Sequence, residues 1–300
     1  MWTPEFQSFV APARAKPQVW RLLLGIVTVL GVYMLGIIAI LLAVWALAGN
    51  AGLTGWMQRI ALADTPTAVL LMLATFTGMA AGCGLAVRAW HGRAASTLSG
   101  AGTARGFAVA GIIAAVVFIM TMVILPAPFT LIRNTPADLF LSFLPLAILG
   151  LLVQTGAEEV LFRGYLQQQV AARFDHPFVW MVLPACLFGM LHLDPATAGP
   201  NAWLLVAAAT LFGLVAADLT RVTGSIGAAW GMHFVNNAFA VLIVALDGSL
   251  SGLSWWKTPF TATNTDILRP LIAQDLITTI IIWAAIRLWL ARRTGRAAAN

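Results

Sequence analysis

Charged residues are scarce in this chain of 300 residues: they make up 9% of the sequence, whereas apolar residues make up 60%. Ordinary soluble proteins contain about 25% charged and about 45–50% apolar residues. The mean hydropathy of +0.89 points the same way. The length alone would allow one or two soluble domains, but this composition excludes an ordinary soluble protein and predicts a chain that crosses a membrane several times.

Other features are also absent or rare. The chain has only two cysteines, Cys83 and Cys186, and both lie in apolar segments, so we expect small core residues rather than a disulfide. It has no basic helix or lysine-rich run, so the net charge of +6 does not indicate nucleic-acid binding. Residues 1–21 lack the pattern of a cleavable signal peptide, because the apolar run after them is too long. We expect a cytoplasmic segment there that is disordered or loosely bound to the membrane surface, or whose aromatic residues lie in the interface.

Apolar segments recur along the chain, and a helix needs about 20 mainly apolar residues to cross a membrane. About eight segments qualify, although the fifth is short: Leu22–Leu47, Ala68–Val87, Phe107–Leu125, Leu139–Ala157, Phe178–Leu193, Ala202–Leu219, Ile226–Leu246 and Leu271–Leu290. No internal repeat or long linker separates a second domain. We therefore predict an all-α fold, a polytopic transmembrane bundle of about eight helices that forms a single integral-membrane domain over residues 1–300.

Positive charges are unevenly distributed over the loops. With the N-terminus in the cytoplasm, that side receives all of the 17 lysines and arginines except four: Arg59, Arg133, Lys257 and Arg269. Since lysine and arginine concentrate in cytoplasmic loops, we predict that both termini are cytoplasmic and that the number of spans is even. Trp255 and Trp256 in the last outer loop are expected to anchor the chain at the interface. The pattern fits a bacterial plasma membrane, with the lipid bilayer as the protein's surroundings.

Few polar side chains fall inside the predicted spans, and each charge at mid-helix costs about 2.5–3.5 kcal/mol. The candidates are Glu158, Glu159, Arg163, His192, Asp218, His233, Asn236 and Asn237. Asp218 lies one turn before Arg221 near a helix end, which predicts a local pair. His91 and His176 lie in predicted loops and receive no role.

The stretch "QTGAEEVLFRGYLQQQ" contains the first of these groups. Glu159 and Arg163 are spaced i,i+4 with the acid first, which favours an ion pair along a helix. Glu158 lies about 100° away around the same helix, so it is free to face a cavity. A simple interfacial charge cluster is the alternative. The helix continues past Ala157, either straight or with a kink, and Gln167 to Gln169 are expected to mark where it leaves the bilayer.

The histidines lie on two other segments. Phe188 and His192 are one turn apart on the fifth segment, and His233 and Asn237 are one turn apart on the seventh. A glutamate can take a proton from water, imidazoles can hold that water or move protons, and an amide NH₂ can stabilise an oxyanion. Together these groups have the chemistry that peptide hydrolysis needs in a poorly solvated cavity.

The motifs Glu158-Glu159-x-x-x-Arg163, Phe188-x-x-x-His192 and His233-x-x-x-Asn237, in this order, resemble the CAAX protease and bacteriocin-processing (CPBP) family of intramembrane proteases. That family includes the type II CAAX prenyl endopeptidases. The resemblance covers about a third of the chain, residues 146–246, which would form the catalytic core. It implies an intramembrane endopeptidase whose substrate is a peptide or protein at the membrane.

The resemblance also implies roles for individual residues. Glu158 would be the general base, and Glu159 with Arg163 the supporting pair. His192 and His233 would be the catalytic histidines and Asn237 the oxyanion-stabilising amide, with Phe188 as a supporting residue. Members of this family are described both as glutamic and as metalloproteases. Both readings stay open here: Glu158, His192 and His233 are a possible zinc ligand set, and the same residues also work without a metal.

Other protease classes fit less well. None of the four histidines is followed by glutamate, which excludes the His-Glu-x-x-His helix of zinc-dependent site-2 proteases. Ser225 and His233 share one predicted span, which argues against a rhomboid protease. Two further alternatives are a proton-coupled transporter that uses the buried glutamate and histidines as a relay, and a non-enzymatic membrane partner or immunity protein of the same fold.

Overall fold

The computed structural model describes residues 2–299, with side chains described for residues 2–292. Met1 and Asn300, the ends of the predicted domain, and the side chains of Arg293 and Arg296, two of the predicted cytoplasmic charges, lie outside the described residues. The α-helices in chain order are α1 (Pro4–Val10), α2 (Val19–Leu62), α3 (Pro66–His91), α4 (Thr103–Ile124), α5 (Ala137–Glu159), α6 (Gln168–Ala171), α7 (Leu183–Met190), α8 (Pro195–Ala198), α9 (Ala202–Thr223), α10 (Gly227–Ala238) and α11 (Thr265–Ala299).

Shorter helical turns and strands connect these helices. The 3₁₀ turns are η1 (Ala11–Ala13), η2 (Ala95–Leu98) and η5 (Gly199–Asn201), and the π-helical segments are η3 (Val160–Gln167), η4 (Phe178–Val182) and η6 (Phe239–Ile243). The strands β1 (Ile132–Arg133), β2 (Val244–Ala245) and β3 (Trp256–Lys257) form a small sheet in the order β1-β3-β2. β3 pairs antiparallel with β1 and parallel with β2. This sheet was not predicted.

The predicted all-α membrane bundle is confirmed. In the described part of the chain, six helices are long and apolar enough to cross a membrane: Val19–Leu62, Pro66–His91, Thr103–Ile124, Ala137–Ala171, Pro195–Thr223 and Thr265–Arg292. The fifth predicted segment is a shorter apolar helix, Phe178–Met190, and the seventh forms α10 and η6. Each of the eight predicted segments is helical over most of its length, although the seventh ends in β2. Their number as spans stays a prediction.

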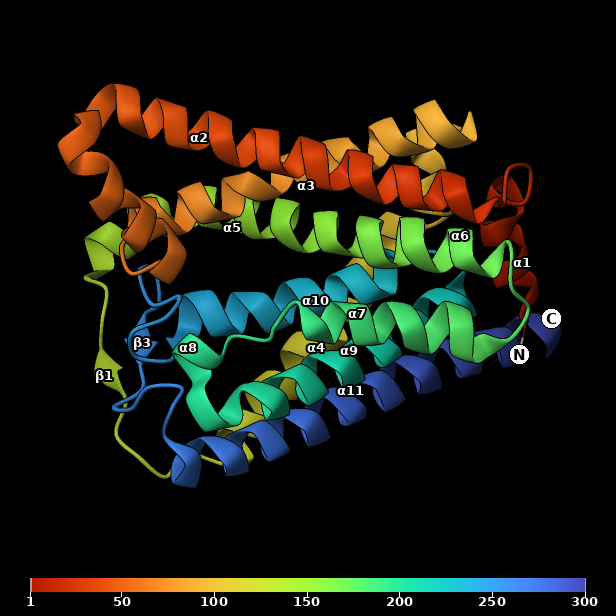
Figure 1. Ribbon diagram of the computed structural model, residues 1–300. Helices are drawn as coiled ribbons and strands as arrows, with labels where there is room; N and C mark the ends of the chain where they lie inside the picture. Colours follow the sequence, from red (N-terminus) through yellow and green to blue (C-terminus); the bar gives the residue numbers. More distant parts are fainter. Residues whose placement is uncertain (1, 300) are drawn as a thin grey trace.

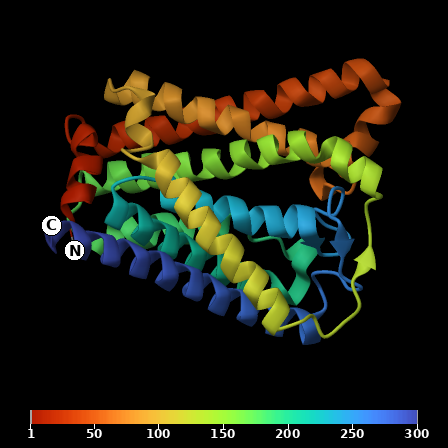
Figure 2. The ribbon, with the colours of Figure 1, turned by 180° about the vertical axis from the view of Figure 1, so that it is seen from behind.

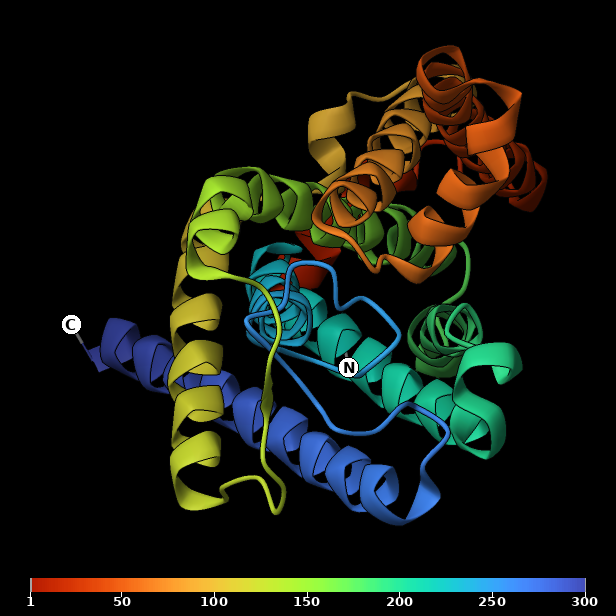
Figure 3. The same cartoon turned by 90° about the vertical axis from the view of Figure 1, so that its left-hand side faces the viewer.

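Most of the long helices run lengthwise through the bundle (Figure 1). α2, α3 and α5 form one side of the bundle, and α4 crosses the helices of the other side obliquely, nearest the viewer in Figure 2. α10 lies near the middle when the bundle is viewed end-on, and it packs against α4, α5 and α9 (Figure 3). α1 and the C-terminal end of α11 lie at the same end of the bundle (Figure 1). That both termini are cytoplasmic stays a prediction.

The N-terminal segment differs from the prediction. α1 packs into the main apolar core, and Phe6 and Phe9 are 0% and 4% exposed. The centre of the Phe6 ring lies 4.8 Å from that of Trp180, which precedes α7. The prediction of a disordered or loosely bound tail is therefore wrong. Its spaced aromatic residues form the apolar face of a helix that caps one end of the bundle.

The three glutamines at the end of the "EEVLFRGYLQQQ" stretch are buried. Gln167, Gln168 and Gln169 are at most 1% exposed. Gln167 Nε2 donates to the carbonyl of Ala217, 3.0 Å away, and Gln169 Nε2 donates to that of Lys16, 2.8 Å away. That they mark where the helix leaves the bilayer stays a prediction; the helix itself ends at Ala171. Buried amides can be retained because they hydrogen-bond backbone groups of other segments, and here they tie the helix to α9 and to the N-terminal segment.

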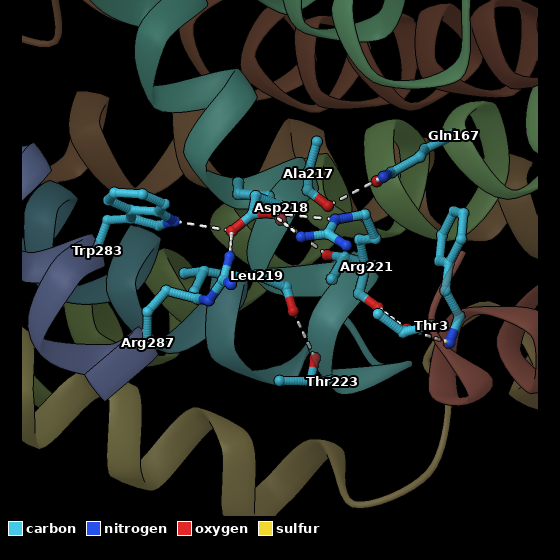
Figure 4. Close-up of polar contacts among 12 residues, drawn as sticks. Thr3, Gln167, Ala217, Asp218, Leu219, Arg221, Thr223, Trp283 and Arg287 are labelled. Carbon is cyan, nitrogen blue, oxygen red and sulfur yellow. Dashed lines mark hydrogen bonds and ion pairs between the residues drawn. The ribbon is translucent and has the colours of Figure 1, made fainter. Parts of the chain in front are cut away.

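Asp218 joins α9 to α11 (Figure 4). The predicted local pair is confirmed, since Arg221 Nη2 lies 2.7 Å from Asp218 Oδ1. The other carboxylate oxygen accepts from Trp283 Nε1 at 2.8 Å and from Arg287 Nη1. The pair is therefore part of a contact between two helices, because α11 supplies two further donors.

Two smaller predictions also need correction. His91 is the last residue of α3 rather than a loop residue, and its Nε2 lies 3.0 Å from the hydroxyl of Tyr165. Both cysteines are free, as expected, but only Cys83 is a core residue; Cys186 is exposed on α7. The sequence of an apolar helix does not show which of its faces packs against other helices. Cys186 lies on the face of α7 that points away from them.

Candidate active site

The "EEVLFRG" stretch lies inside a continuous helix, Ala137–Ala171, formed by α5, η3 and α6. The helix does not end at the glutamates but changes to π-helical hydrogen bonding from Val160 to Gln167. Such π-helical segments occur frequently at functional sites. Glu158 and Glu159 therefore lie within the bundle, with two further helical segments between them and the next loop.

Glu159 and Arg163 form the predicted i,i+4 ion pair. Arg163 Nη1 lies 2.9 Å from Glu159 Oε1, and the two side chains are 2% and 0% exposed. The second nitrogen, Nη2, donates to the carbonyl of Gly213 on α9 at 3.3 Å. The guanidinium also lies 4.9 Å from the centre of the Phe188 ring. The buried carboxylate is therefore compensated by an arginine that α9 and Phe188 hold in place.

His233 on α10 contacts both glutamates. Its Nδ1 lies 2.8 Å from Glu159 Oε1, and its Nε2 lies 3.4 Å from Glu158 Oε2. A carboxylate oxygen only accepts hydrogen bonds, so Nδ1 carries a proton and donates it to Glu159. Nε2 then faces Glu158, and the two groups are arranged to share one proton. Glu159 thus orients His233 in addition to pairing with Arg163, which the sequence did not indicate.

His192 lies just beyond the end of α7, one turn after Phe188. Its Nδ1 donates to the Phe188 carbonyl at 2.9 Å, which leaves Nε2 as an acceptor. The side chain of Phe188 is buried, and its ring centre lies 4.9 Å from that of His192 and 5.9 Å from that of His233. Phe188 therefore packs against both histidines, and its supporting role stays a prediction.

The close approach of α7 to α9 depends on a glycine. A Cβ at Gly213 would lie 3.0 Å from the Cα of Ala185, one turn before Phe188 and Gly189 on α7. Small residues allow helix backbones to approach closely in membrane proteins. The same glycine offers its carbonyl to Arg163. Gly213 therefore contributes twice: its lack of a side chain allows α7, which carries Phe188, to pack closely, and its carbonyl accepts a hydrogen bond from the Arg163 guanidinium.

Asn237 is part of a chain of amides. Its Nδ2 donates to Gln154 Oε1 at 2.9 Å, and its Oδ1 accepts from Asn236 Nδ2 at 3.3 Å. Gln154 lies one turn before Glu158 on the same helix and is 7% exposed. It was missed in the sequence, although its i,i+4 spacing to Glu158 was available as a signal. Gln154 orients the amide that was predicted to stabilise an oxyanion.

These groups share a cavity of about 480 Å³. Its polar lining includes side chains of α5, of the turn after α7 and of α10: Gln154, Glu158, His192, His233, Asn236 and Asn237. Apolar residues of α3, α9 and η6 and Leu250, in the loop between β2 and β3, also line it. Glu159 and Arg163 lie behind it. The structure thus brings Glu158, His192, His233 and Asn237 to one cavity. It adds Asp275 and Thr279 of α11, which the sequence analysis did not single out.

The grouping of these residues bears on whether they fit a metal ion. Among the side chains of residues 2–292, no three His, Cys, Asp or Glu residues are placed together to hold a metal ion. The nitrogen Nδ1 of each histidine is already used, by the Phe188 carbonyl in His192 and by Glu159 in His233. The alternative zinc ligand set Glu158, His192 and His233 stays a prediction.

Comparison with known proteins gives matches that include the segment carrying these residues. Residues 140–239 match the family model described as type II CAAX prenyl endopeptidase Rce1-like. The chain is also 26% identical over 296 residues to the uncharacterized protein YyaK of Bacillus subtilis (strain 168), and the match covers 96% of this chain and 97% of that relative. No solved structure matches the chain. The matched segment contains every predicted site residue from Glu158 to Asn237.

Proposed function

We propose, from the Rce1-like domain that the chain carries at residues 140–239, that this multi-pass membrane protein is an intramembrane endopeptidase. It would hydrolyse a peptide bond of a membrane-associated peptide or protein, with a water molecule activated by Glu158. A bacterial plasma membrane is the proposed location. The observation that carries the proposal is the coupling of Glu158 to His233, Glu159 and Arg163 at the wall of a cavity that also contains His192 and Asn237.

In the first step, Glu158 accepts a proton from a water molecule in the cavity, and the oxygen of that water attacks the carbonyl carbon of the substrate. The free acceptor Nε2 of His192 would hold the water for this attack. His233 would support Glu158 by sharing its proton at Nε2, while Glu159 stabilises positive charge on the imidazole. This arrangement is analogous to the aspartate behind the histidine of a serine-protease triad.

In the second step, the carbonyl oxygen becomes an oxyanion, and the Asn237 amide would donate to it. The C–N bond then breaks, and the proton that Glu158 or His233 has taken passes to the leaving amine. The products are a carboxylate and a protonated amine, so one water is consumed for each bond cleaved, and both of its protons end on the amine or are exchanged with the carboxylate.

His192 gives the direct test of the proposed function. The variant His192→Ala should lower the cleavage rate of a reporter peptide by about 10²-fold, because the water loses its acceptor. The measurement uses purified protein in detergent with a library of quenched fluorescent peptides. His176→Ala, a change in an exposed loop, is the matched control and should cleave like the wild type. Equal rates for His192→Ala and wild type, or proton-coupled uptake in proteoliposomes without cleavage, would contradict the proposal.

Gln154 provides a second prediction. Replacement by leucine removes the acceptor that holds Asn237 Nδ2, so the turnover number kcat should fall about five- to tenfold, the effect of one hydrogen bond of about 1 kcal/mol. KM should change little, because the amide acts on the oxyanion rather than on the bound substrate. Steady-state kinetics on the best reporter peptide measure both constants. Gln7→Leu, on the exposed side of α1, is the control, and an increase in KM alone would contradict the positioning role.

A further inference from the structure

The cavity holds a second intramembrane carboxylate, Asp275, on α11. This helix lies outside the matched segment at residues 140–239. The residues that α11 buries lie on one face of the helix and include Leu268, Ile272, Thr279, Ile282 and Ile286. Asp275 falls on this face, about one turn from Ile272 and from Thr279, although its own side chain is exposed. It lines the cavity together with Thr279, so the cavity is open to this side chain, whereas residues such as Ile277 and Ile281 form the outer side of the helix.

Asp275 differs from Glu158, Glu159 and Asp218, the carboxylates that the packed helices bury wholly or partly. Glu159 is paired with Arg163, Asp218 with Arg221 and Arg287, and Glu158 lies against His233. Within the part of the chain whose side chains are described, Asp275 forms no ion pair and no hydrogen bond. Carboxylates within spans are rare, face the interior or a cavity, and usually have a partner there. None of the described residues around Asp275 therefore serves as its partner.

The composition of the cavity indicates what that partner is. Among its described lining residues there is no lysine or arginine, and its acids are Glu158 and Asp275. The remaining lining is largely apolar, with residues such as Met72, Leu205 and Phe212. Such a site attracts a group that carries positive charge and is flanked by apolar atoms, and it disfavours a second carboxylate.

We propose that Asp275 binds a positive charge of the substrate, so that the substrates are membrane-associated peptides with a basic residue near the cleaved bond. A lysine or arginine side chain at that position would enter the cavity from an apolar segment, and its charge would pair with Asp275. This inference rests on the proposed peptidase function. Asp275 then determines specificity, while Glu158 and the histidines perform the chemistry.

The experiment compares matched peptides. An apolar quenched fluorescent peptide receives lysine, glutamine or glutamate at each position in turn, and cleavage is measured with wild type, Asp275→Asn and Asp275→Glu. For wild type, kcat/KM for the best lysine peptide should exceed that for its glutamine counterpart on the order of 30-fold, within the range of coupling energies of close charge pairs at interfaces. The ratio should fall toward one in Asp275→Asn and be largely kept in Asp275→Glu. Asp266→Asn, an exposed position at the start of the same helix, should keep the wild-type ratio.

A binding measurement separates failure of this inference from failure of the proposed function. Fluorescence anisotropy with the lysine and glutamine peptides reports binding without cleavage. Cleavage by wild type with a lysine-to-glutamine ratio near one, or a ratio unchanged in Asp275→Asn, overturns the role of Asp275 and leaves the peptidase intact. Preferential binding of lysine peptides that depends on Asp275, without cleavage of any peptide, overturns the peptidase and retains the cationic ligand.

Discussion

The Glu158→Gln variant is expected to fold and insert like the wild type and to lose peptide cleavage by about 10²- to 10⁴-fold, the usual contribution of a general base. Glutamine has the shape of glutamate but cannot accept the proton of the attacking water. The side chain is 14% exposed and has no described partner closer than His233 Nε2, at 3.4 Å. Replacing the Glu158 carboxylate by a neutral amide therefore leaves the buried Glu159–Arg163 pair unchanged. We expect the variant to lose catalytic activity while it keeps its folded structure.

The measurement is cleavage of the best reporter peptide by purified variants, together with their elution profile in detergent as a test of folding. Glu5→Gln, on the exposed side of α1, makes the same chemical change elsewhere and should cleave like the wild type. Full cleavage by Glu158→Gln would contradict the role of Glu158 as the general base.

The sequence was most informative about contacts within one helix. The pair between Glu159 and Arg163 follows from the i,i+4 spacing, because the helical repeat brings such residues together whatever surrounds the helix. The same repeat placed Asp218 beside Arg221. The positions of the apolar helices were equally accessible, since the thickness of a bilayer sets the length of an apolar segment. All of these features depend on local geometry alone.

Contacts between helices could not be predicted in this way. The hydrogen bond from His233 to Glu159 joins residues 74 positions apart, and it depends on how α10 packs against α5. The amide contact from Asn237 to Gln154 has the same origin. Asp275 lies within the predicted span Leu271–Leu290 and was overlooked there; only the packing of α11 shows that it lines the cavity. The candidate site was therefore predicted as a set of residues but not as a set of contacts.

The N-terminal segment and the three glutamines show a second kind of contact that the sequence does not reveal. We expected residues 1–21 to form a disordered or loosely bound tail, or to place aromatic residues in the interface, and the burial of the glutamines was not predicted. In the structure, Gln168 Nε2 donates to the carbonyl of Phe9 at 2.6 Å and to that of Thr97 at 2.9 Å. Polar side chains that satisfy backbone groups of another segment can be fully buried. A pattern of polarity alone does not distinguish this arrangement from exposure to water.

The Arg163→Met variant is expected to lower the free energy of unfolding by about 3–5 kcal/mol, the cost of leaving a buried charge without its partner. Glu159 has 0% of its side chain exposed, and its second oxygen, Oε2, has no hydrogen-bond partner among the described residues. Without Arg163, this carboxylate retains only the contact to His233. Methionine fills much of the volume of arginine, so the decrease in the free energy of unfolding measures the effect of the missing charge rather than of lost packing.

A double variant, Glu159→Gln with Arg163→Met, separates stability from activity. It removes both charges, so much of the stability should return, because replacing a whole buried ion pair by neutral groups is often close to neutral. Cleavage should stay low, since the neutral amide introduced at position 159 does not stabilise the His233 imidazolium. Thermal unfolding in detergent, followed by tryptophan fluorescence, measures stability, with Arg105→Met at an exposed position as the control. Wild-type stability in Arg163→Met would show that Glu159 does not depend on this arginine, and full activity of the double variant would show that the Glu159 charge has no part in the reaction.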